Sequence, residues 1–185
     1  RIARRLAERA LVVVDEAYVE FADGSSLVAR LADLPNLVVL RTLSKAYALA
    51  GARCGSVIAD AAIIELLRRM IPPYALPAPT IEAVLTALEA PRLVQARDRM
   101  QRLVAERDRI APALGALPLV ARVWPSAANF LLVETRDAAR FLAAGTRAGL
   151  LLRDFSAGRY TPGCVRVSVG TPEQNDRLLR SLASA

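Results

Sequence analysis

The first half of the chain alternates short apolar runs with short stretches of helical periodicity. Three segments have the composition and length of strands, the first two as continuous apolar runs: 11–14, 37–40 and 53–58. Helical spacing predicts three short helices, the first of them after a turn at 23–26: 27–34, 61–70 and 80–89. We expect the first two strands to be buried, because they are continuous apolar runs. We also expect them to pair in parallel, because a short crossover joins them.

The second half opens with a long amphipathic helix, predicted at 91–115, whose apolar residues share one face. Shorter patterns follow, which predict strands at 119–124, 130–133, 150–153 and 165–169 and helices at 137–148 and 172–182. Such a mixture is typical of a small α+β domain. We therefore divide the chain into a first domain at 1–90, a connecting helix at 91–115 and a small domain at 116–185.

Composition places the chain among folded, water-soluble proteins. Hydrophobic residues make up 54% of the sequence and charged residues 23%, so enough apolar surface is available to bury a core. No apolar run approaches the roughly 18 residues that a membrane helix needs, and no secretory leader is visible. We therefore expect a cytoplasmic protein without a membrane partner.

The absence of histidine excludes Ser-His-Asp and Cys-His triads and most zinc sites. The two cysteines, Cys54 and Cys164, show no metal-binding or redox spacing, so we predict free thiols beside strands and no metal site. Acid–base chemistry must then come from lysine, carboxylates or tyrosine.

The chain carries a net charge of +7, and only one of its 25 basic residues is a lysine. The arginines are dispersed and interleaved with acidic residues, as at 106–109, and aromatic residues make up only 5%. A nucleic-acid-binding surface would need clustered charge and aromatic side chains for stacking. We therefore predict no nucleic-acid partner; affinity that falls steeply with added salt would favour one.

Five chemically different groups are expected at one edge of the predicted sheet. Asp15 ends the first strand and Lys45 follows the second, so parallel pairing brings both to the carboxyl edge, where open α/β sheets bind ligands. Tyr18 lies on the loop that leaves the first strand, while Ser44 and Arg53 flank the lysine. Lys45 is the only lysine of the chain, and arginine cannot replace an amine that must lose its proton to form a Schiff base.

These groups match the needs of pyridoxal 5'-phosphate (PLP). Lys45 supplies the amine that condenses with the aldehyde, and Asp15 supplies the anionic partner of the ring nitrogen. Tyr18 is a donor for the phenolic oxygen, and Ser44 and Arg53 are donors for the phosphate. Taken one at a time, such residues are more often structural, as turn, cap or surface positions. Together they predict PLP as the cofactor.

Two segments, 14–21 (VDEAYVEF) and 41–55 (RTLSKAYALAGARCG), closely resemble histidinol-phosphate aminotransferases, which belong to the fold type I group of PLP enzymes. The resemblance extends over essentially the whole chain. It implies an α/β fold: the C-terminal part of a large domain, with a mostly parallel sheet and flanking helices, followed by a small α+β domain. It also implies that Lys45 is the catalytic residue. The implied cofactor-binding residues are Asp15, Tyr18, Ser44, Lys45 and Arg53.

The same resemblance implies the substrates. Arg166, in the segment CVRVSVGT, resembles the arginine that clamps the α-carboxylate of glutamate or 2-oxoglutarate. Arg153, in LLRD, resembles the arginine that meets the phosphate of histidinol phosphate. The implied reaction, a step of histidine biosynthesis, interconverts L-histidinol phosphate plus 2-oxoglutarate with imidazole-acetol phosphate plus L-glutamate. A homodimer is implied as well, and Asn129 matches a family position to which we assign no role.

Complete members of this family are longer, so we expect the chain to be their C-terminal portion. Two other enzymes of the same fold remain open, a threonine-phosphate decarboxylase and an aromatic amino-acid aminotransferase. A PLP-binding regulatory module without catalysis is the third alternative. Release of carbon dioxide from phosphothreonine would favour the first, and activity on phenylalanine the second.

Overall fold

The structure, a computed structural model, describes residues 1–24 and 26–185. The chain divides into two compact units, Arg1–Arg97 and Asp98–Ala185, each with a sheet of its own. The predicted turn at 23–26 includes Ser25, which lies outside the described residues. The finer division into 1–90, 91–115 and 116–185 stays a prediction.

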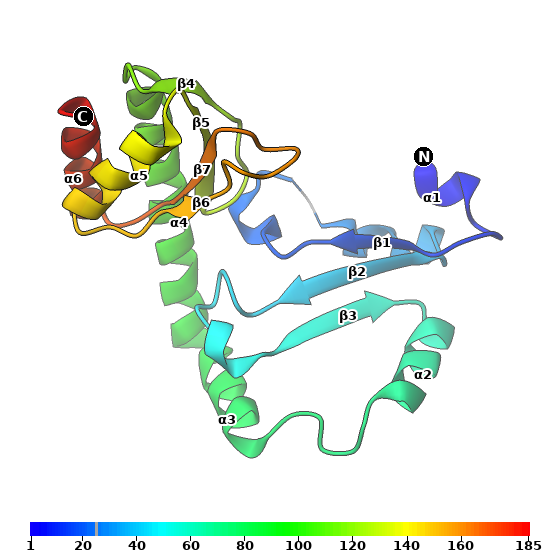
Figure 1. Cartoon of the computed structure of the whole chain (residues 1–185). Helices are drawn as coiled ribbons and strands as arrows, with labels where there is room; N and C mark the ends of the chain where they lie inside the picture. The colour runs from blue at the N-terminus through cyan, green and yellow to red at the C-terminus, as the bar shows by residue number, and fades with distance from the viewer. Residues whose placement is uncertain (25) are drawn as a thin grey trace. The chain divides into compact units, whose positions relative to one another are not determined.

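The first unit is built on a three-stranded sheet in the order β1-β2-β3 (Figure 1). Its strands are β1 (Val12–Asp15), β2 (Leu37–Thr42) and β3 (Gly55–Ala59). β1 and β2 pair in parallel, as expected, with Asp15 opposite Leu40. β2 and β3 pair antiparallel, since the short connection between them returns the chain from the same edge. Within these three strands, one pairing is therefore parallel and one antiparallel.

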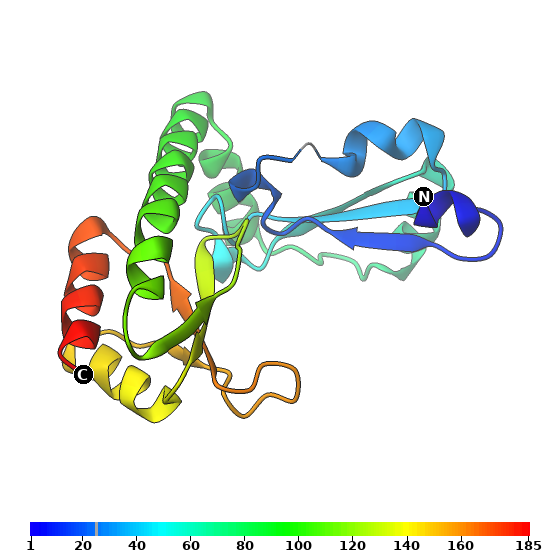
Figure 2. The ribbon, with the colours of Figure 1, turned by 90° about the horizontal axis from the view of Figure 1, so that it is seen from above.

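Short helices connect and cover these strands. They are α1 (Ile2–Arg5), η1 (Val19–Phe21), η2 (Leu27–Asp33), η3 (Ala50–Ala52), α2 (Ala61–Met70) and α3 (Ala78–Ala87). η2 is a 3-10 helix where an α-helix was expected, and it packs against β2 and β3 (Figure 2). Ser26 caps it, because the backbone N–H of Val28 donates to the Ser26 hydroxyl at 3.1 Å.

β3 begins two residues later than the predicted strand at 53–58. Arg53 has a left-handed backbone, with φ 52° and ψ 40°, so it cannot be a strand residue. The strand starts instead at Gly55, where a Cβ would lie 2.7 Å from the carbonyl oxygen of Arg41. The close approach of the two strands therefore requires glycine at this position.

β1 is less buried than its apolar sequence predicts. Val13 is 57% exposed, whereas Val39 of β2 is fully buried. β1 lies at the edge of the described sheet, and every second side chain of the strand is exposed, so nothing among the described residues covers the face that carries Val13. The prediction of a buried strand is therefore wrong for β1 and confirmed for β2.

The second unit consists of an antiparallel sheet in the order β4-β5-β7-β6, with helices against one face (Figure 1). Its strands are β4 (Val120–Val123), β5 (Phe130–Thr135), β6 (Arg153–Asp154) and β7 (Cys164–Ser168). Its helices are α5 (Ala138–Arg147), α6 (Pro172–Ala183) and the C-terminal part of the long α4 (Ala90–Gly115). The strand predicted at 150–153 is wrong except at Arg153, where β6 begins, because the N–H of Leu150 still donates to the carbonyl of Gly145 near the end of α5.

A hydrophobic core lies between this sheet and its helices. Side chains alternate along β5 and β7, so that every second residue is turned toward the helices and is almost completely buried. The central residues of the core are Ile110, Leu114, Leu131, Val133, Phe141, Val165, Val167, Leu178 and Leu182. Apolar burial on this face therefore fixes which face of the sheet remains open.

Removing the largest side chain of this core tests the packing. We expect Phe141→Ala to lower the free energy of unfolding by about 3–5 kcal/mol, since the cavity it leaves cannot be filled. Tyr160→Ala, which truncates an aromatic ring that is 85% exposed, is the matched control and should change stability by less than about 0.5 kcal/mol. Urea denaturation measures both, and equal losses would contradict the assignment of the core.

A polar network holds the end of β7 against α4. The side chain of Asn175, on α6, donates to the carbonyl of Gly170 and accepts from its N–H, at 3.1 and 3.0 Å. The same amide donates to Glu106 of α4 at 2.9 Å, and Glu106 also binds Arg109 through both carboxylate oxygens. These hydrogen bonds lower the pKa of Glu106 below its ordinary 4.5, that of Arg109 contributing most.

The network makes stability depend on pH in a defined direction. Because the folded pKa of Glu106 is depressed, its contribution is present above the pKa of the unfolded chain and is lost as the pH falls through the folded value. We expect Glu106→Gln to be less stable than the unchanged protein at pH 7. Urea midpoints measured at pH 7 and pH 3 should show this gap closing at the lower pH, and a constant gap would contradict the network.

Candidate active site

The carboxyl ends of β1 and β2 lie at the same edge of the first sheet. Asp15 is the last residue of β1, and the N–H of Glu16 still donates to Leu40 of β2 at 2.9 Å. β2 continues to Thr42 and leads directly into the segment that carries Lys45. The parallel pairing thus brings the aspartate and lysine segments to one edge, as the sequence predicts.

The Lys45 amine lies over the ring of Tyr18, with Nζ 5.6 Å from the ring centroid. Lys45 is exposed and forms no ion pair within residues 1–24 and 26–185. The turn that follows is closed by a hydrogen bond from the N–H of Ala48 to the carbonyl of Lys45, at 3.2 Å. Ala48 has a φ of 58°, a left-handed conformation that costs a residue with a Cβ free energy and that often occurs at functional sites.

Ser44 and Arg53 both lie just beyond the end of the pairing between β2 and β3. The N–H of Leu43 donates to Cys54 at 3.3 Å, which extends the β2–β3 pairing by one residue beyond the strands. Ser44 follows Leu43 and Arg53 precedes Cys54, so both stand at the end of this pairing. The Ser44 hydroxyl accepts from Thr42 at 2.9 Å, which leaves its own hydrogen for another acceptor. Arg53 is exposed and donates to Ala50 through Nη1.

The Asp15 carboxylate is oriented by its own loop. Its Oδ1 accepts a hydrogen bond from the N–H of Ala17 at 2.9 Å. In the part of the chain that the structure describes, Asp15 forms no ion pair, so the second oxygen is available to a cationic group. An oriented carboxylate, an unpaired amine, a phenol and a serine–arginine pair on one sheet edge fit the ring nitrogen, aldehyde, phenolic oxygen and phosphate of PLP.

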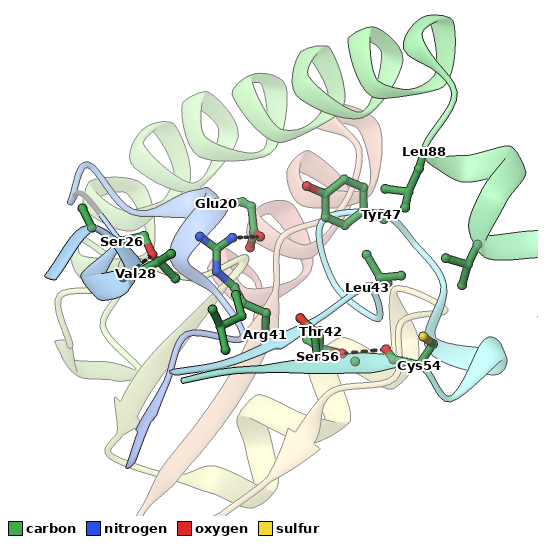
Figure 3. Close-up of a pocket in the computed structure, with 14 residues that line it drawn as sticks. Glu20, Ser26, Val28, Arg41, Thr42, Leu43, Tyr47, Cys54, Ser56 and Leu88 are labelled. Carbon is green, nitrogen blue, oxygen red and sulfur yellow. Dashed lines mark hydrogen bonds and ion pairs between the residues drawn. The ribbon is translucent and has the colours of Figure 1, made fainter. Parts of the chain in front are cut away.

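A pocket of about 840 Å³ lies on the first unit and shares Thr42 with this edge (Figure 3). Its polar lining consists of Glu20, Ser26, Arg41, Thr42, Tyr47 and Ser56. None of the five predicted cofactor residues lines it. The groups at the strand ends, rather than this pocket, therefore define the candidate cofactor site.

An ion-pair network beside the site was not predicted from the sequence. Arg41 donates to Glu16 at 3.1 Å and to Glu20 at 2.9 Å. Glu16 is only 7% exposed, which is unusual for a carboxylate. The available signal was the pair of acidic residues four positions apart beside Asp15, with an arginine directly after the apolar run of β2.

The two predicted substrate arginines lie opposite each other on the second sheet. Arg153 of β6 pairs with Arg166 of β7 in antiparallel register, on the face turned away from the hydrophobic core. Like charges directly opposite each other destabilise a sheet. Neither guanidinium forms an ion pair within the described ranges, and Asp154 instead binds Ser156, which lowers the pKa of Asp154. This concentration of positive charge suits an anionic ligand.

Aromatic rings hold these arginines. The Arg166 guanidinium lies 5.3 Å from the Phe130 ring and 5.8 Å from the Phe155 ring, and Arg153 lies 5.9 Å from Phe155. Arg166 Nε is buried and has no hydrogen-bond partner among the described residues. A buried donor without a partner is rare in folded proteins, so it marks a position where a ligand acceptor fits. Asn129 accepts a hydrogen bond from the N–H of Val169 through its backbone carbonyl, and we assign no further role to it.

Other kinds of site receive no support from the described residues. Cys54 and Cys164 are free, and burial, followed by the nearby Glu134, raises the pKa of Cys164. No cluster of three metal-binding side chains occurs in residues 1–24 and 26–185. Among the helices described, none combines the length and the apolar composition needed to span a membrane.

The chain resembles known proteins along its whole length. Residues 1–182 match the family model for aminotransferase class I and II. A histidinol-phosphate aminotransferase of Xylella fastidiosa is 50% identical over 181 residues, which cover 98% of this chain and 50% of the relative. The chain therefore spans about half the length of the curated relatives it matches.

Solved structures agree with this fold. The histidinol-phosphate aminotransferase from Sinorhizobium meliloti, solved with pyridoxal-5'-phosphate, has a TM-score of 0.77 and 27% identity, over 94% of this chain and 48% of its own. L-Threonine-O-3-phosphate decarboxylase from Porphyromonas gingivalis has a TM-score of 0.86 and 25% identity, over 100% of this chain and 57% of its own. Sheet topology, site chemistry and the family match agree: this chain belongs to the aminotransferase class I and II family.

Proposed function

We propose that this chain is the C-terminal half of a PLP-dependent histidinol-phosphate aminotransferase, a cytoplasmic homodimer. It interconverts L-histidinol phosphate plus 2-oxoglutarate with imidazole-acetol phosphate plus L-glutamate. The name of the relative that is 50% identical supports this substrate. The observation that carries the proposal is the Lys45 amine, which lies over the Tyr18 ring at the edge where Asp15 ends its strand and has no ion-pair partner among the described residues.

The residues of the first unit would hold PLP in one orientation. Asp15 would accept from the ring nitrogen through its free oxygen and keep that nitrogen protonated. The Tyr18 hydroxyl would donate to the phenolic oxygen. Ser44 and Arg53, which both lie just beyond the end of the β2–β3 pairing, would donate to the phosphate. Once bound, PLP supplies an electron-withdrawing ring that stabilises negative charge at the α-carbon of the substrate.

Lys45 has two tasks in this proposal. Its Nζ would hold the cofactor at the aldehyde, and it would also carry a proton to and from the substrate α-carbon. Both tasks require an amine that can be deprotonated. Among the described residues no carboxylate is paired with Nζ, so the amine is accessible to the aldehyde and to the substrate.

The arginines of the second unit would bind the anionic ends of the substrates. Arg166 would clamp the α-carboxylate, for which its buried and unpartnered Nε is suited. Arg153 would bind the phosphate of histidinol phosphate. The two like charges repel each other until an anion neutralises them, so the pair favours anionic substrates.

A threonine-phosphate decarboxylase is the second candidate, because a solved structure with that activity has the same fold at 25% identity. Phosphothreonine carries both a carboxylate and a phosphate, which the two arginines could bind, so these arginines do not exclude the second candidate. Incubation of the whole protein with phosphothreonine and with histidinol phosphate separates them. Carbon dioxide from the former, without amino transfer from the latter, would replace the first candidate by the second.

Lys45 provides the most direct test of the cofactor assignment. We expect Lys45→Ala in the whole protein to abolish the visible absorbance of lysine-bound PLP and to reduce amino transfer by on the order of 10²–10⁴-fold or more. Lys45→Arg is the matched variant, since it keeps the charge but cannot lose the proton, and it should behave alike. Retention of the absorbance band in either variant would contradict the assignment.

The two arginines should separate kinetically. We expect Arg153→Ala to raise the KM for histidinol phosphate by about 10–100-fold, the effect of a lost charge-assisted hydrogen bond, and to leave the KM for glutamate near its original value. Arg166→Ala should instead raise the KM for glutamate, because glutamate carries the α-carboxylate that this arginine would bind and histidinol phosphate carries none. Arg159→Ala, which removes an exposed arginine from the connection between β6 and β7, is the control. Equal effects of Arg153→Ala and Arg159→Ala would reject the phosphate role.

A further inference from the structure

The guanidinium of Arg41 binds the loop that carries Tyr18 on both sides of the tyrosine. Arg41 Nε donates to Glu16 Oε2 at 3.1 Å, and Arg41 Nη1 donates to Glu20 Oε1 at 2.9 Å. Glu16 and Glu20 stand two residues before and two residues after Tyr18. Figure 3 shows the guanidinium of Arg41 turned toward Glu20. The two contacts of Arg41 therefore enclose the segment that carries Tyr18, whose ring lies beneath the Lys45 amine.

Glu16 anchors the first end of this segment. Its Oε2 also accepts from the hydroxyl of Ser26, and its Oε1 accepts from the N–H of Leu27, both at 2.7 Å. Both carboxylate oxygens are thus occupied in a nearly buried position, which leaves the side chain no freedom to rotate. Because Glu16 directly follows Asp15, the same contacts fix the backbone at the end of β1.

Arg41 connects this loop with the segment that carries Lys45. It lies near the end of β2, four residues before Lys45, and its strand is hydrogen-bonded to β1 up to Glu16. One side chain therefore connects the strand that leads to the amine with the loop that holds the phenol. A change in the length or direction of this contact would alter the separation of Nζ and the Tyr18 ring.

A contribution to the stability of the fold is a poor explanation for the network of Arg41, Glu16 and Glu20. It places two carboxylates around one guanidinium, and Glu20 Oε2 is buried without a hydrogen-bond partner among the described residues. Buried ion pairs are often no more stabilising than apolar side chains of similar volume, whereas they do fix geometry. The exposed pair of Arg69 and Glu65 in the same unit has no such surroundings.

We propose that Arg41, acting through Glu16 and Glu20, is a positioning residue that sets the geometry between Tyr18 and Lys45. The inference rests on the proposed function, in which both residues contact PLP. It predicts that loss of the contact changes the electronic environment of bound cofactor, and does so in the same sense as loss of the Tyr18 hydroxyl.

The test is the pH titration of the absorbance band of PLP bound to the whole protein. The variants are Tyr18→Phe, Arg41→Met and Glu20→Leu, with Arg69→Met as the control for loss of a surface ion pair. Glu20→Leu removes only one arm of the network together with an unsatisfied oxygen, so it is expected to fold even if Arg41→Met does not. Circular dichroism and thermal melting without cofactor identify the folded variants.

We expect Tyr18→Phe and each folded variant of the network to move the titration midpoint in the same direction, by at least about half a pH unit. Arg69→Met should titrate like the unchanged protein. Midpoints at the original value in every folded network variant, alongside a shifted Tyr18→Phe, would overturn this inference alone. An unshifted Tyr18→Phe would instead refute the role of Tyr18 in the proposed function, and the inference with it.

Discussion

The parallel pairing of β1 with β2 is the constraint on which the candidate cofactor site depends. It brings the carboxyl ends of two strands to one edge, so that Asp15 and the segment of Lys45 meet although a whole crossover separates them in the sequence. The antiparallel return of β3 brings Arg53 to the end of the β2–β3 pairing, beyond which Ser44 also lies. Local hydrogen bonds then orient each group: the N–H of Ala17 orients the aspartate, and Thr42 the serine.

The candidate substrate site of the second unit depends on side-chain packing and not on the pairing of parallel strands. A core of interlocking apolar side chains commits one face of the sheet to the helices and leaves the other face open. On the open face, Arg153 and Arg166 stand side by side against aromatic rings instead of carboxylates. Rings hold the guanidinium groups in place without neutralising them, so their charge remains available to anions.

The sequence was sufficient to predict most of the elements and the edge where the candidate site forms, because apolar runs and the order of Asp15 and Lys45 are local signals. It was not sufficient where the outcome depends on tertiary contacts. The left-handed backbone of Arg53 follows from the tight turn into β3, and the burial of Glu16 follows from its contacts with η2 and Arg41. Neither leaves a periodic pattern in the residues. The exposure of β1 likewise depends on what packs beside the strand.

The central claim is that the amine of Lys45 is the group to which PLP becomes attached. Borohydride treatment of the whole protein loaded with PLP, followed by proteolysis and mass spectrometry, locates the attached pyridoxyl group directly. Our account predicts a single modified peptide that contains Leu43, Ser44 and Lys45. A pyridoxyl group found on any other amine, with this peptide unmodified, would contradict it.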